Sequence, residues 1–467
     1  MRDQKCQKLS EVQNGGESED IISNLPDCIL HHILSFLPTK DAVGTCILSM
    51  RWKYLWTLVP NIDFDDALLY SNEVNGWYPL EMTCFMNFVE RVLLLRDAST
   101  MKRFRLSCRV CFCASRVNAW VSSAIIHNVQ ELDLCLFVEK PFILPRCLFD
   151  GNSLTVVKIE MNCVLELPSY ISFPCLKTLH LCLVTFANDN STQKLFSSCP
   201  VLQELAILDC EWINLKQVAI SIPTLESLTI DDLPYFGSTD DLHGCQIKID
   251  AANLIYLKYI GYLSNEFFLC NVSSLVKAYI HIPMMCERRK EISHRAVKLL
   301  RELHNIGSVR ISNRTIESLF LADNVLEHLP LFNNLTHLEL SMEIENQTVS
   351  ALVELLQHSP NLQSLYFAEV GRLGLDRFMH FGEDDWNLTS KPKCLRSTLK
   401  TVSFRNFHGH DAEICFLKYF LENALVLERI IIYCSKYPSG DETKQRDVRN
   451  QLQTFARGST CLVITYM

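Results

Sequence analysis

The sequence predicts an α/β protein in which a small N-terminal helical module precedes a curved solenoid with a parallel sheet on its concave face. Two observations carry this prediction. The segment Ile21–Trp56 places apolar residues at helical spacing, and the rest of the chain repeats one short apolar pattern many times. A length of 467 residues exceeds one typical domain but suits a repeat array.

Three short helices are predicted in the N-terminal module. Pro26 fits the first turn of the first helix, where a missing N–H costs nothing, and Asp27 favours the positive end of the helix dipole. Pro38 ends this helix, and Thr39 is the predicted N-cap of the second. The third helix is predicted from apolar residues at i, i+3 and i+4, namely Trp52, Leu55 and Trp56.

A unit of this size cannot bury all its apolar surface internally, so part of that surface is expected to face a partner. The alternative is an ordinary helical cap on a larger core. The module resembles a plant-type F-box, with mild departures at Cys28, Gly44 and Met50. The matching residues are Leu25-Pro26, Ile29-Leu30, Ile33-Leu34, Phe36–Asp41, Leu48-Ser49 and Arg51–Trp56.

This resemblance implies docking onto the Skp-family adaptor of cullin–RING ubiquitin ligases. Some of the matching apolar residues must hold the three helices together, and the sequence does not separate the two groups. The candidate adaptor-binding residues are Leu25, Pro26, Ile29, Leu30, Ile33, Leu37, Pro38, Leu48, Trp52, Leu55 and Trp56.

The body of the chain repeats an apolar residue, two residues, an apolar residue, one residue and an apolar residue, at offsets of mostly about 21 to 31 residues. This pattern is typical of leucine-rich repeats, whose stacked strands form a parallel sheet. A generic α/β fold is the alternative. The copies are Met101–Leu106 (weak), Val129–Leu134, Leu154–Ile159, Leu176–Leu181, Leu202–Ile207, Leu225–Ile230, Leu254–Tyr259, Leu275–Ile280, Ile306–Ile311, Leu335–Leu340, Leu362–Phe367, Leu399–Phe404 and Leu427–Ile432.

Residues that flank the inward leucines of such repeats face the concave surface. Aromatic, histidine and charged residues interleave at these positions, as a protein-binding face requires; an ordinary solvated sheet face is the alternative. The candidate target-binding residues are His180, Asp231, Tyr256, Lys258, Tyr279, His281, Arg310, His337, Glu339 and Tyr366.

The C-terminal part resembles a second plant module, the FBD domain. The resemblance rests on Trp386, Cys394-Leu395, Leu399–Val402, Tyr419–Leu421 and Arg457–Ser459, among others. The pattern predicts strands Thr398–Arg405, Leu427–Cys434 and Cys461–Tyr466, a helix capped by Asp411 and a second helix at about Lys444–Phe455. This unit is expected to extend the sheet and close the exposed end of the solenoid.

The predicted organisation has five parts. Residues 1–20 are polar and expected to be disordered. Residues 21–66 form the F-box, 67–100 a connector with a helix at about Glu81–Arg96, 101–385 the leucine-rich repeats, and 386–467 the FBD module.

Composition and the N-terminal sequence limit the classes of partner and the cellular location that we expect. A formal charge of −9 argues against binding a nucleic-acid backbone, and no apolar stretch is long enough to cross a membrane. The N-terminus lacks the apolar core of a signal peptide, so a cytoplasmic or nuclear location is expected. The 21 cysteines are then expected to be reduced.

The sequence gives little indication of a metal-binding or catalytic site. Cys108, Cys111 and Cys113 have zinc-like proximity, but a second pair of ligands at defined spacing is missing, so reduced core thiols are favoured. His31 and His32 are adjacent and point in different directions on a helix. His408, His410 and Asp411 fit a turn and a helix cap. No metal or cofactor is expected, and no phosphate-binding loop or nucleophile elbow occurs in the sequence.

The predicted function is therefore non-catalytic. The F-box would hold the Skp-family adaptor, and through it the cullin and RING subunits, while the repeats hold an unknown target protein for ubiquitination. The alternative is a leucine-rich-repeat scaffold that binds proteins but does not act in a ligase. An enzyme hosted on the repeats is the third class, and the sequence offers it no catalytic residues.

Overall fold

The computed structural model describes residues 22, 24–68, 79–96, 101–108, 113–137, 142–233, 244–283, 289–320, 329–341, 346–369, 391–409, 411–434 and 450–466. The predicted disordered segment 1–20, Cys111, Trp386 and His410 lie outside the described residues.

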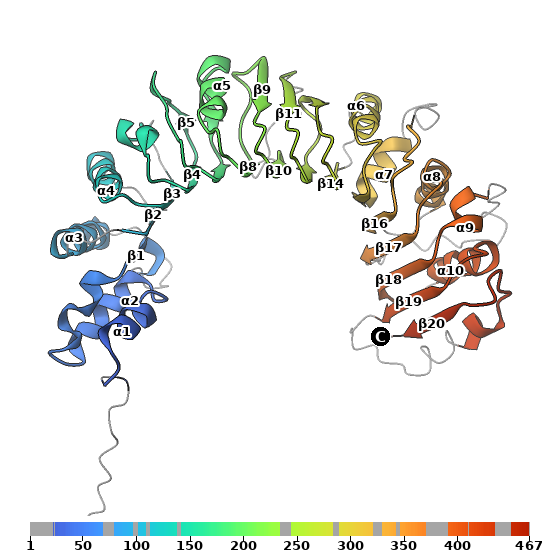
Figure 1. The fold of residues 1–467 in the computed structure, drawn as a ribbon, viewed down its shortest axis with the longest axis horizontal. Coiled ribbons are helices and arrows are strands. Elements are labelled where there is room, and N and C mark those ends of the chain that lie inside the picture. Colours follow the sequence, from blue (N-terminus) through green and yellow to red (C-terminus); the bar gives the residue numbers. More distant parts are fainter. Residues whose placement is uncertain are drawn as a thin grey trace, which may run out of the picture.

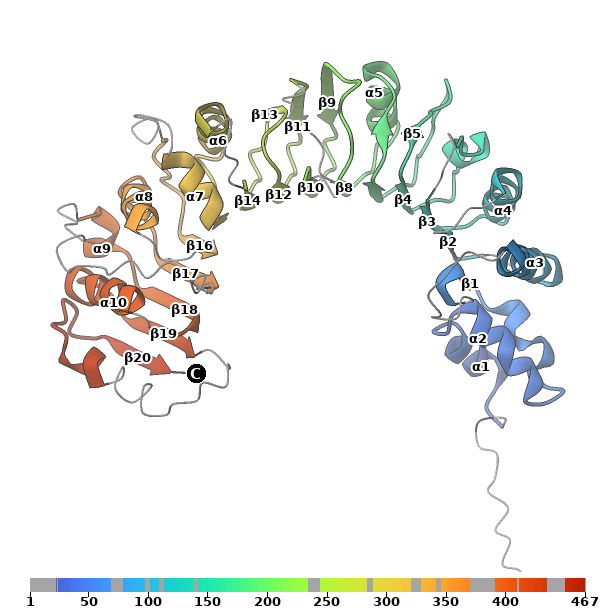
Figure 2. The same ribbon diagram turned by 180° about the vertical axis from the view of Figure 1, so that it is seen from behind.

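The molecule is an arch with strands along its inner rim and helices or short strands along its outer rim (Figures 1 and 2). A single 15-stranded sheet, parallel throughout, forms the inner rim. In spatial order its strands are β1 (Asn61–Asp65), β2 (Arg103–Cys108), β3 (Glu131–Leu136), β4 (Val156–Met161), β6 (Thr178–Cys182), β8 (Glu204–Leu208), β10 (Ser227–Asp231), β12 (Tyr256–Ile260), β14 (Lys277–His281), β15 (Ser308–Ser312), β16 (His337–Ser341), β17 (Ser364–Glu369), β18 (Thr401–Phe407), β19 (Arg429–Cys434) and β20 (Val463–Tyr466).

The repeated pattern sets the register of this sheet. Leu179 of β6 pairs with Leu205 of β8, which pairs with Leu228 of β10, so equivalent positions of successive repeats align. These side chains are buried, while the residues between them point to the concave side. The first apolar residue of each copy, such as Leu202, is buried as well. The predicted solenoid with its parallel sheet is confirmed.

The outer rim changes along the arch. Helices cover it toward both ends, whereas the middle repeats carry a three-stranded sheet, a two-stranded sheet and helix α5 (Figure 1). The helices are α3 (Pro79–Leu95), α4 (Ala114–Ile126), η4 (Arg146–Asp150), α5 (Asp189–Ser197), α6 (Arg289–Glu302), α7 (Asn313–Phe320), α8 (Asn346–Gln357), α9 (Lys393–Ser397) and α10 (Asp411–Asn423). The outer strands are β9 (Gln217–Ser221), β11 (Gln246–Asp250) and β13 (Glu266–Cys270) in one sheet, with β5 (Val164–Leu165) and β7 (Thr185–Phe186) in the other.

The N-terminal module contains α1 (Asp27–Leu34), α2 (Thr39–Gly44), η1 (Thr45–Ile47) and η2 (Trp52–Leu58). Prolines precede both α-helices as N-caps, so Pro26 lies one position before the first turn. The prediction of Thr39 as an N-cap is wrong by one residue, because Pro38 takes that position. Thr39 is instead buried, and its hydroxyl accepts a hydrogen bond from the Asp63 backbone N–H.

The repeat array begins earlier than residue 101. Strand β1, at Asn61–Asp65, pairs in parallel with β2 along its whole length. The predicted connector therefore contributes η3 (Asp66–Leu68) and α3 to the first repeat, and the predicted F-box segment contributes its strand. The sequence signal is Val59–Ile62–Phe64, which has the spacing of the later copies and is buried like them.

The C-terminal strands continue the same sheet. As predicted, β18 pairs with β17 and β19 pairs with β18, and β20 follows. Asp411 is the first residue of α10 rather than its N-cap. Of the second predicted helix, residues 450–454 are helical, and residues 444–449 lie outside the described ranges.

Aromatic side chains join this end to the preceding repeat. The rings of Phe367 and Phe404 stack with centroids 4.7 Å apart, and Phe416 packs edge-on against Phe367 at 5.2 Å. All three are fully buried. Phe367 belongs to β17, and its two partners belong to β18 and α10, so β17 depends on the C-terminal strands for its burial.

We expect truncation after residue 385 to expose Phe367 and its strand to water, giving aggregation or loss of cooperative unfolding. Size-exclusion chromatography and thermal melts of the truncated and full-length chains measure this. The conservative variant Phe404→Leu is the control, because it keeps an apolar partner on Phe367 and should stay monodisperse. A truncated chain that unfolds as cooperatively as the full chain would show that the C-terminal strands are energetically independent.

Candidate functional site

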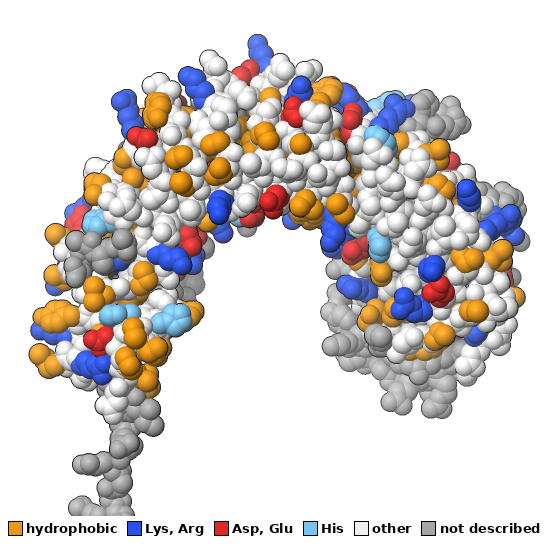
Figure 3. All heavy atoms as spheres, in the orientation of Figure 1, with side chains coloured by type: hydrophobic (Ala, Val, Ile, Leu, Met, Phe, Trp, Pro, Cys, Tyr) orange, Lys and Arg blue, Asp and Glu red, His pale blue; other side chains and the backbone are white. Residues whose placement is uncertain are grey.

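The N-terminal module exposes more large apolar side chains than a self-contained helical cap would. Ile47 is 85% exposed, Met50 81% and Phe36 75%. Hydrophobic side chains gather over this module at the N-terminal end of the arch (Figure 3). We call the exposed set the apolar face; it comprises Ile22, Ile29, Ile33, Phe36, Leu37, Ile47, Leu48, Met50 and Tyr54.

The structure separates the predicted docking residues into two groups. Leu30, Trp52, Leu55 and Trp56 are buried in the core of the module, where they hold its helices together and adjoin the first repeat. Leu25 and Pro38 are partly buried. The exposed group is Pro26, Ile29, Ile33, Leu37 and Leu48.

Five members of the apolar face were not among the predicted docking residues: Ile22, Phe36, Ile47, Met50 and Tyr54. Helical periodicity selects the inward stripe, so it favours residues such as Trp52 that a folded module hides. Ile47 and Tyr54 lie in the short 3-10 helices η1 and η2, and Phe36 and Met50 lie in turns, so α-helical periodicity does not select them. The signal that could have found them is the excess of large apolar residues between Phe36 and Tyr54 over what so small a module buries.

A polar clamp fixes the two ends of the module. The Arg51 guanidinium donates hydrogen bonds to the Asp27 carboxylate at 2.7 Å and to the backbone carbonyl of Leu25. It thereby links the start of α1 to the segment before η2. Because both side chains are exposed, the pair adds little stability. Its effect is geometric: it sets how the beginning of α1 lies against η2.

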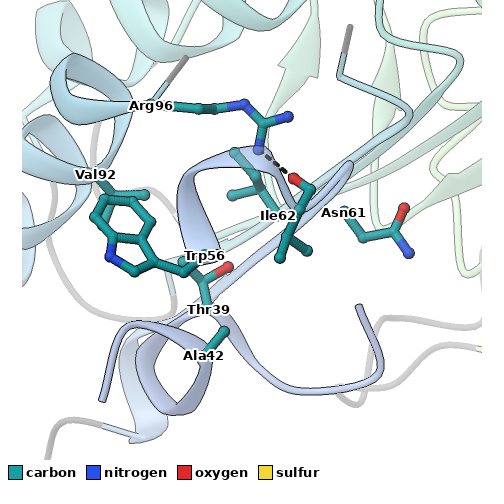
Figure 4. Close-up of a pocket in the computed structure, with 8 residues that line it drawn as sticks. Thr39, Ala42, Trp56, Asn61, Ile62, Val92 and Arg96 are labelled. Atoms are coloured by element: carbon teal, nitrogen blue, oxygen red, sulfur yellow. Dashed lines mark hydrogen bonds between the residues drawn. The ribbon is translucent and has the colours of Figure 1, made fainter. Parts of the chain in front are cut away.

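The module is joined directly to the first repeat. The Asp63 backbone N–H donates to Thr39 Oγ1 at 2.8 Å, Asn61 Nδ2 donates to the Ser35 carbonyl at 3.4 Å, and Arg96 of the segment after α3 donates to the Val59 carbonyl. Figure 4 shows the small pocket at this joint. It is lined by Thr39, Ala42, Trp56, Val59, Asn61, Ile62, Val92 and Arg96. These contacts hold the module in one orientation against β1.

All the predicted target-binding residues lie on the concave face of the 15-stranded sheet. Charged and hydrophobic side chains interleave along this inner rim in Figure 3. Most of them come together on neighbouring strands, from Tyr256 and Lys258 on β12 to Tyr366 on β17. His180 lies apart on β6, where its Nε2 contacts Glu204 at 2.9 Å. Asp231 is the last residue of β10 and lies in the same row of the sheet as His281.

The first strands of the concave face carry charges that neutralise one another. Arg105 contacts Asp63 at 2.8 Å, Asp65 at 3.4 Å and Asp133 at 3.9 Å, and Arg103 adds a contact to Asp133 at 3.7 Å. Burial opposes the charged guanidinium, but the hydrogen bond and charge of Asp63, with those of the other carboxylates, raise the pKa of Arg105 overall. This network crosslinks β1, β2 and β3.

An unusual carboxyl follows β10. Burial raises the pKa of Asp232 to about 7; a hydrogen bond from Trp212 Nε1 opposes the increase, and the nearby charge of Asp231 adds to it. The neighbouring Tyr259 hydroxyl accepts from the Leu263 backbone N–H, and burial raises its pKa. Gly261 brings its backbone so close that an added Cβ would meet Tyr259 Oη at 2.8 Å. These groups pack together and stiffen the junction of β10 with β12.

The thiols show no constellation for metal chemistry in the described ranges. There, no three His, Cys, Asp or Glu side chains are arranged to hold a metal ion, and no described cysteine forms a disulfide bond. Cys108 is buried, which raises the pKa of its thiol, whereas hydrogen bonding to Ser115 lowers the pKa of the exposed Cys113. Cys111 is outside these ranges, so the zinc alternative stays a matter for experiment.

Other candidate groups have structural partners. The His32 ring packs edge-on against Phe36 at 4.9 Å. The Glu413 carboxylate accepts a hydrogen bond from the His408 backbone N–H, as a side chain at a helix start does. In the part of the chain that the structure describes, no helix combines the length and apolar character needed to span a membrane.

Two family models match the chain. The F-box domain matches residues 22–63, and the leucine-rich-repeat domain described as At1g61320/AtMIF1 matches residues 92–460. These matches define the class: an F-box followed by leucine-rich repeats.

Relatives from Arabidopsis thaliana extend the match over nearly the whole chain. F-box/LRR-repeat protein At4g14096 is 30% identical over 459 residues, covering 95% of this chain and 94% of the relative. FBD-associated F-box protein At5g22730 is 30% identical over 468 residues, covering 96% and 94%. Putative F-box protein At1g58310 is 31% identical over 465 residues, covering 90% of each. The chain belongs to the plant F-box/leucine-rich-repeat family.

The raised pKa of Asp232 predicts a pH-dependent stability. Its folded-state pKa of about 7 exceeds the ordinary value of 3.8, so between these values the folded state binds more protons and stability falls as pH rises. The free energy of unfolding of Asp232→Asn should therefore fall less than that of the parent chain between about pH 5.5 and about pH 8. The slopes of the two pH dependences should differ by at most about 1.4 kcal/mol per pH unit. Urea unfolding at both pH values measures this, and parallel pH dependences in the two proteins would contradict it.

The thiols predict insensitivity to reductant and chelator. If the cysteines are reduced and hold no metal, dithiothreitol and EDTA should each leave the unfolding temperature unchanged. Differential scanning fluorimetry measures both. A large decrease with EDTA that is absent in Cys113→Ser would assign a zinc site to the segment containing Cys108, Cys111 and Cys113.

Proposed function

We propose that this protein is the substrate-recognition subunit of an SCF-type cullin–RING ubiquitin ligase. The F-box docks onto a Skp-family adaptor, which carries the cullin and RING subunits, and the concave face binds a target protein. The observation that carries this proposal is the apolar face. It lies on the F-box itself, and residues such as Ile47 and Met50 have no partner in the described chain to cover them.

The chain is proposed to act by positioning and not by chemistry. Its two surfaces belong to one rigid unit, because the F-box is hydrogen-bonded to β1 and β1 begins the sheet. A target on the concave face would therefore be held at a fixed place relative to the adaptor. Such tethering raises the effective concentration of a target lysine near the ubiquitin-charged enzyme. Reaction chemistry belongs to the other subunits.

We further propose that residues 386–467 form an FBD module that caps the solenoid. Support comes from the continuation of the sheet through β18, β19 and β20 and from the aromatic cluster around Phe404 and Phe416. An FBD-associated F-box protein among the relatives agrees with this. The module covers apolar surface that β17 would otherwise expose. A cytoplasmic or nuclear location, where such ligases act, is part of the proposal.

The apolar face predicts which substitutions abolish adaptor binding. Ile47→Glu with Leu48→Glu places two charges on exposed positions, so the fold should persist while co-purification of the adaptor falls at least about tenfold. Leu94→Glu is the matched control, since Leu94 is 81% exposed but lies on α3 outside the F-box. The measurement is co-expression with a Skp-family adaptor followed by affinity capture.

Three outcomes separate the candidate functions. Adaptor binding by the parent chain and its loss in the double variant, followed by recovery of cullin in the complex, support the ligase role. Adaptor binding without cullin would favour the scaffold that does not act in a ligase. Undiminished adaptor capture by a folded Ile47→Glu/Leu48→Glu chain would refute the proposed docking surface.

A further inference from the structure

We propose that strands β12 to β16 of the concave face bind an acidic peptide segment of the target, with an apolar side chain between two carboxylates. This inference rests on the proposed function, because it names the class of target that the concave face would take. We call the outward-facing residues Tyr256, Lys258, Lys277, Tyr279, Arg310 and His337 the basic-aromatic patch.

The register brings this patch together. Lys258 pairs with Tyr279, Tyr279 with Arg310, and Arg310 with Glu339, so these four side chains form one row across adjacent strands. Neighbouring strands lie about 4.8 Å apart, which puts Lys258 and Arg310 on the order of 10 Å apart. A polyproline-II chain has three residues per turn and rises about 3.1 Å per residue, so its residues i and i+3 lie on one face at about that spacing. A peptide with acidic residues at positions i and i+3 therefore matches the two cations.

The charges of the patch favour an anionic partner. Lys258, Lys277 and Arg310 are its cations, and Glu339 is the sole carboxylate among the outward-facing residues of β12, β14, β15 and β16. Glu339 is occupied by Arg310, whose Nε lies 3.6 Å from it. Within the described residues, Lys258 and Lys277 have no carboxylate within ion-pair distance. The chain as a whole has a net charge of −9, so this local excess of cations stands out.

The aromatic rings suit an apolar side chain between the two carboxylates. The guanidinium of Arg310 lies over the Tyr279 ring, 5.0 Å from its centroid, and donates to Ser341 Oγ at 3.3 Å. It is therefore held in place before any partner binds. Tyr256 and Tyr279 are partly exposed and rigid, and tyrosine and arginine are the residue types that most often dominate binding energy.

The other end of the concave face does not offer the same site. On β1 to β3, Arg105 and Arg103 already contact Asp63, Asp65 and Asp133. An acidic peptide placed there would have to displace three carboxylates from Arg105, whereas Arg310 contacts one carboxylate, that of Glu339 at 3.6 Å, and Lys258 contacts none within the described residues. The structure thus divides the concave face into a self-neutralised part next to the F-box and a part with available cations beyond its middle.

Fluorescence polarisation tests the proposal on the full chain. The probe is a fluorescein-labelled peptide with the core Glu-Leu-Phe-Glu, flanked by Gly and Ser. We expect saturable binding that weakens with added salt, and at least about tenfold weaker binding of the same peptide with Gln in place of Glu. Lys258→Glu with Arg310→Glu should lose at least about tenfold, and Tyr279→Ala should also weaken binding.

The matched control is Lys248→Glu, an exposed lysine on the outer strand β11, which should leave binding unchanged. Absence of saturable binding, equal binding of the Gln peptide, or equal losses in Lys248→Glu would overturn the proposal. Complete displacement by inorganic phosphate would also overturn it in favour of a small-anion site. Adaptor capture tests the F-box separately, so the peptide-binding result can be interpreted even if the ligase proposal fails.

Discussion

The structure depends on strand β1, which belongs to the F-box segment in sequence and to the repeat sheet in space. The last helix of the module ends at Leu58, and β1 begins at Asn61. Pairing of β1 with β2 then fixes the register from which the parallel sheet continues to β20. Because Thr39 accepts a hydrogen bond from the backbone of Asp63, the F-box and the sheet are held directly against one another.

The F-box and the sheet, held in one orientation, present two separate surfaces: the concave face and the apolar face of the F-box. Residues pointing into the solenoid from β1 to β19 of the large sheet are buried, so only their outward-facing neighbours, such as Tyr256 and Lys258 on β12, are available for recognition. Near the F-box, the charged residues at these outward positions pair with one another around Arg105. Farther along the arch, cations and tyrosines remain available. Exposed apolar side chains on the F-box, such as Ile47, suit a different kind of contact, one that excludes water.

Much of the fold follows from the sequence because one pattern has one structural meaning. Each apolar triplet, such as Leu202–Leu205–Ile207, became a strand with its apolar residues inside. The triplet Val59–Ile62–Phe64 has the same spacing, but because it adjoins the helical module it falls within the predicted F-box segment. For the F-box, periodicity identified Trp52 and Leu30 without showing that packing buries them, and it missed Ile47, which ends the three-residue 3-10 helix η1. The alternation of apolar and polar residues along each strand does predict which residues face the concave side. Which of their charges neutralise one another depends on contacts between neighbouring strands, whose residues are distant in sequence.

The central claim is that the F-box face engages the adaptor while the concave face stays open for a target. Hydrogen–deuterium exchange of the full chain, with and without the purified Skp-family adaptor, measures it most directly. The account predicts new protection confined to peptides within residues 24–58 and unchanged exchange across β12 to β16. Protection of the concave strands by the adaptor, or a complex that leaves residues 24–58 unprotected, would contradict it.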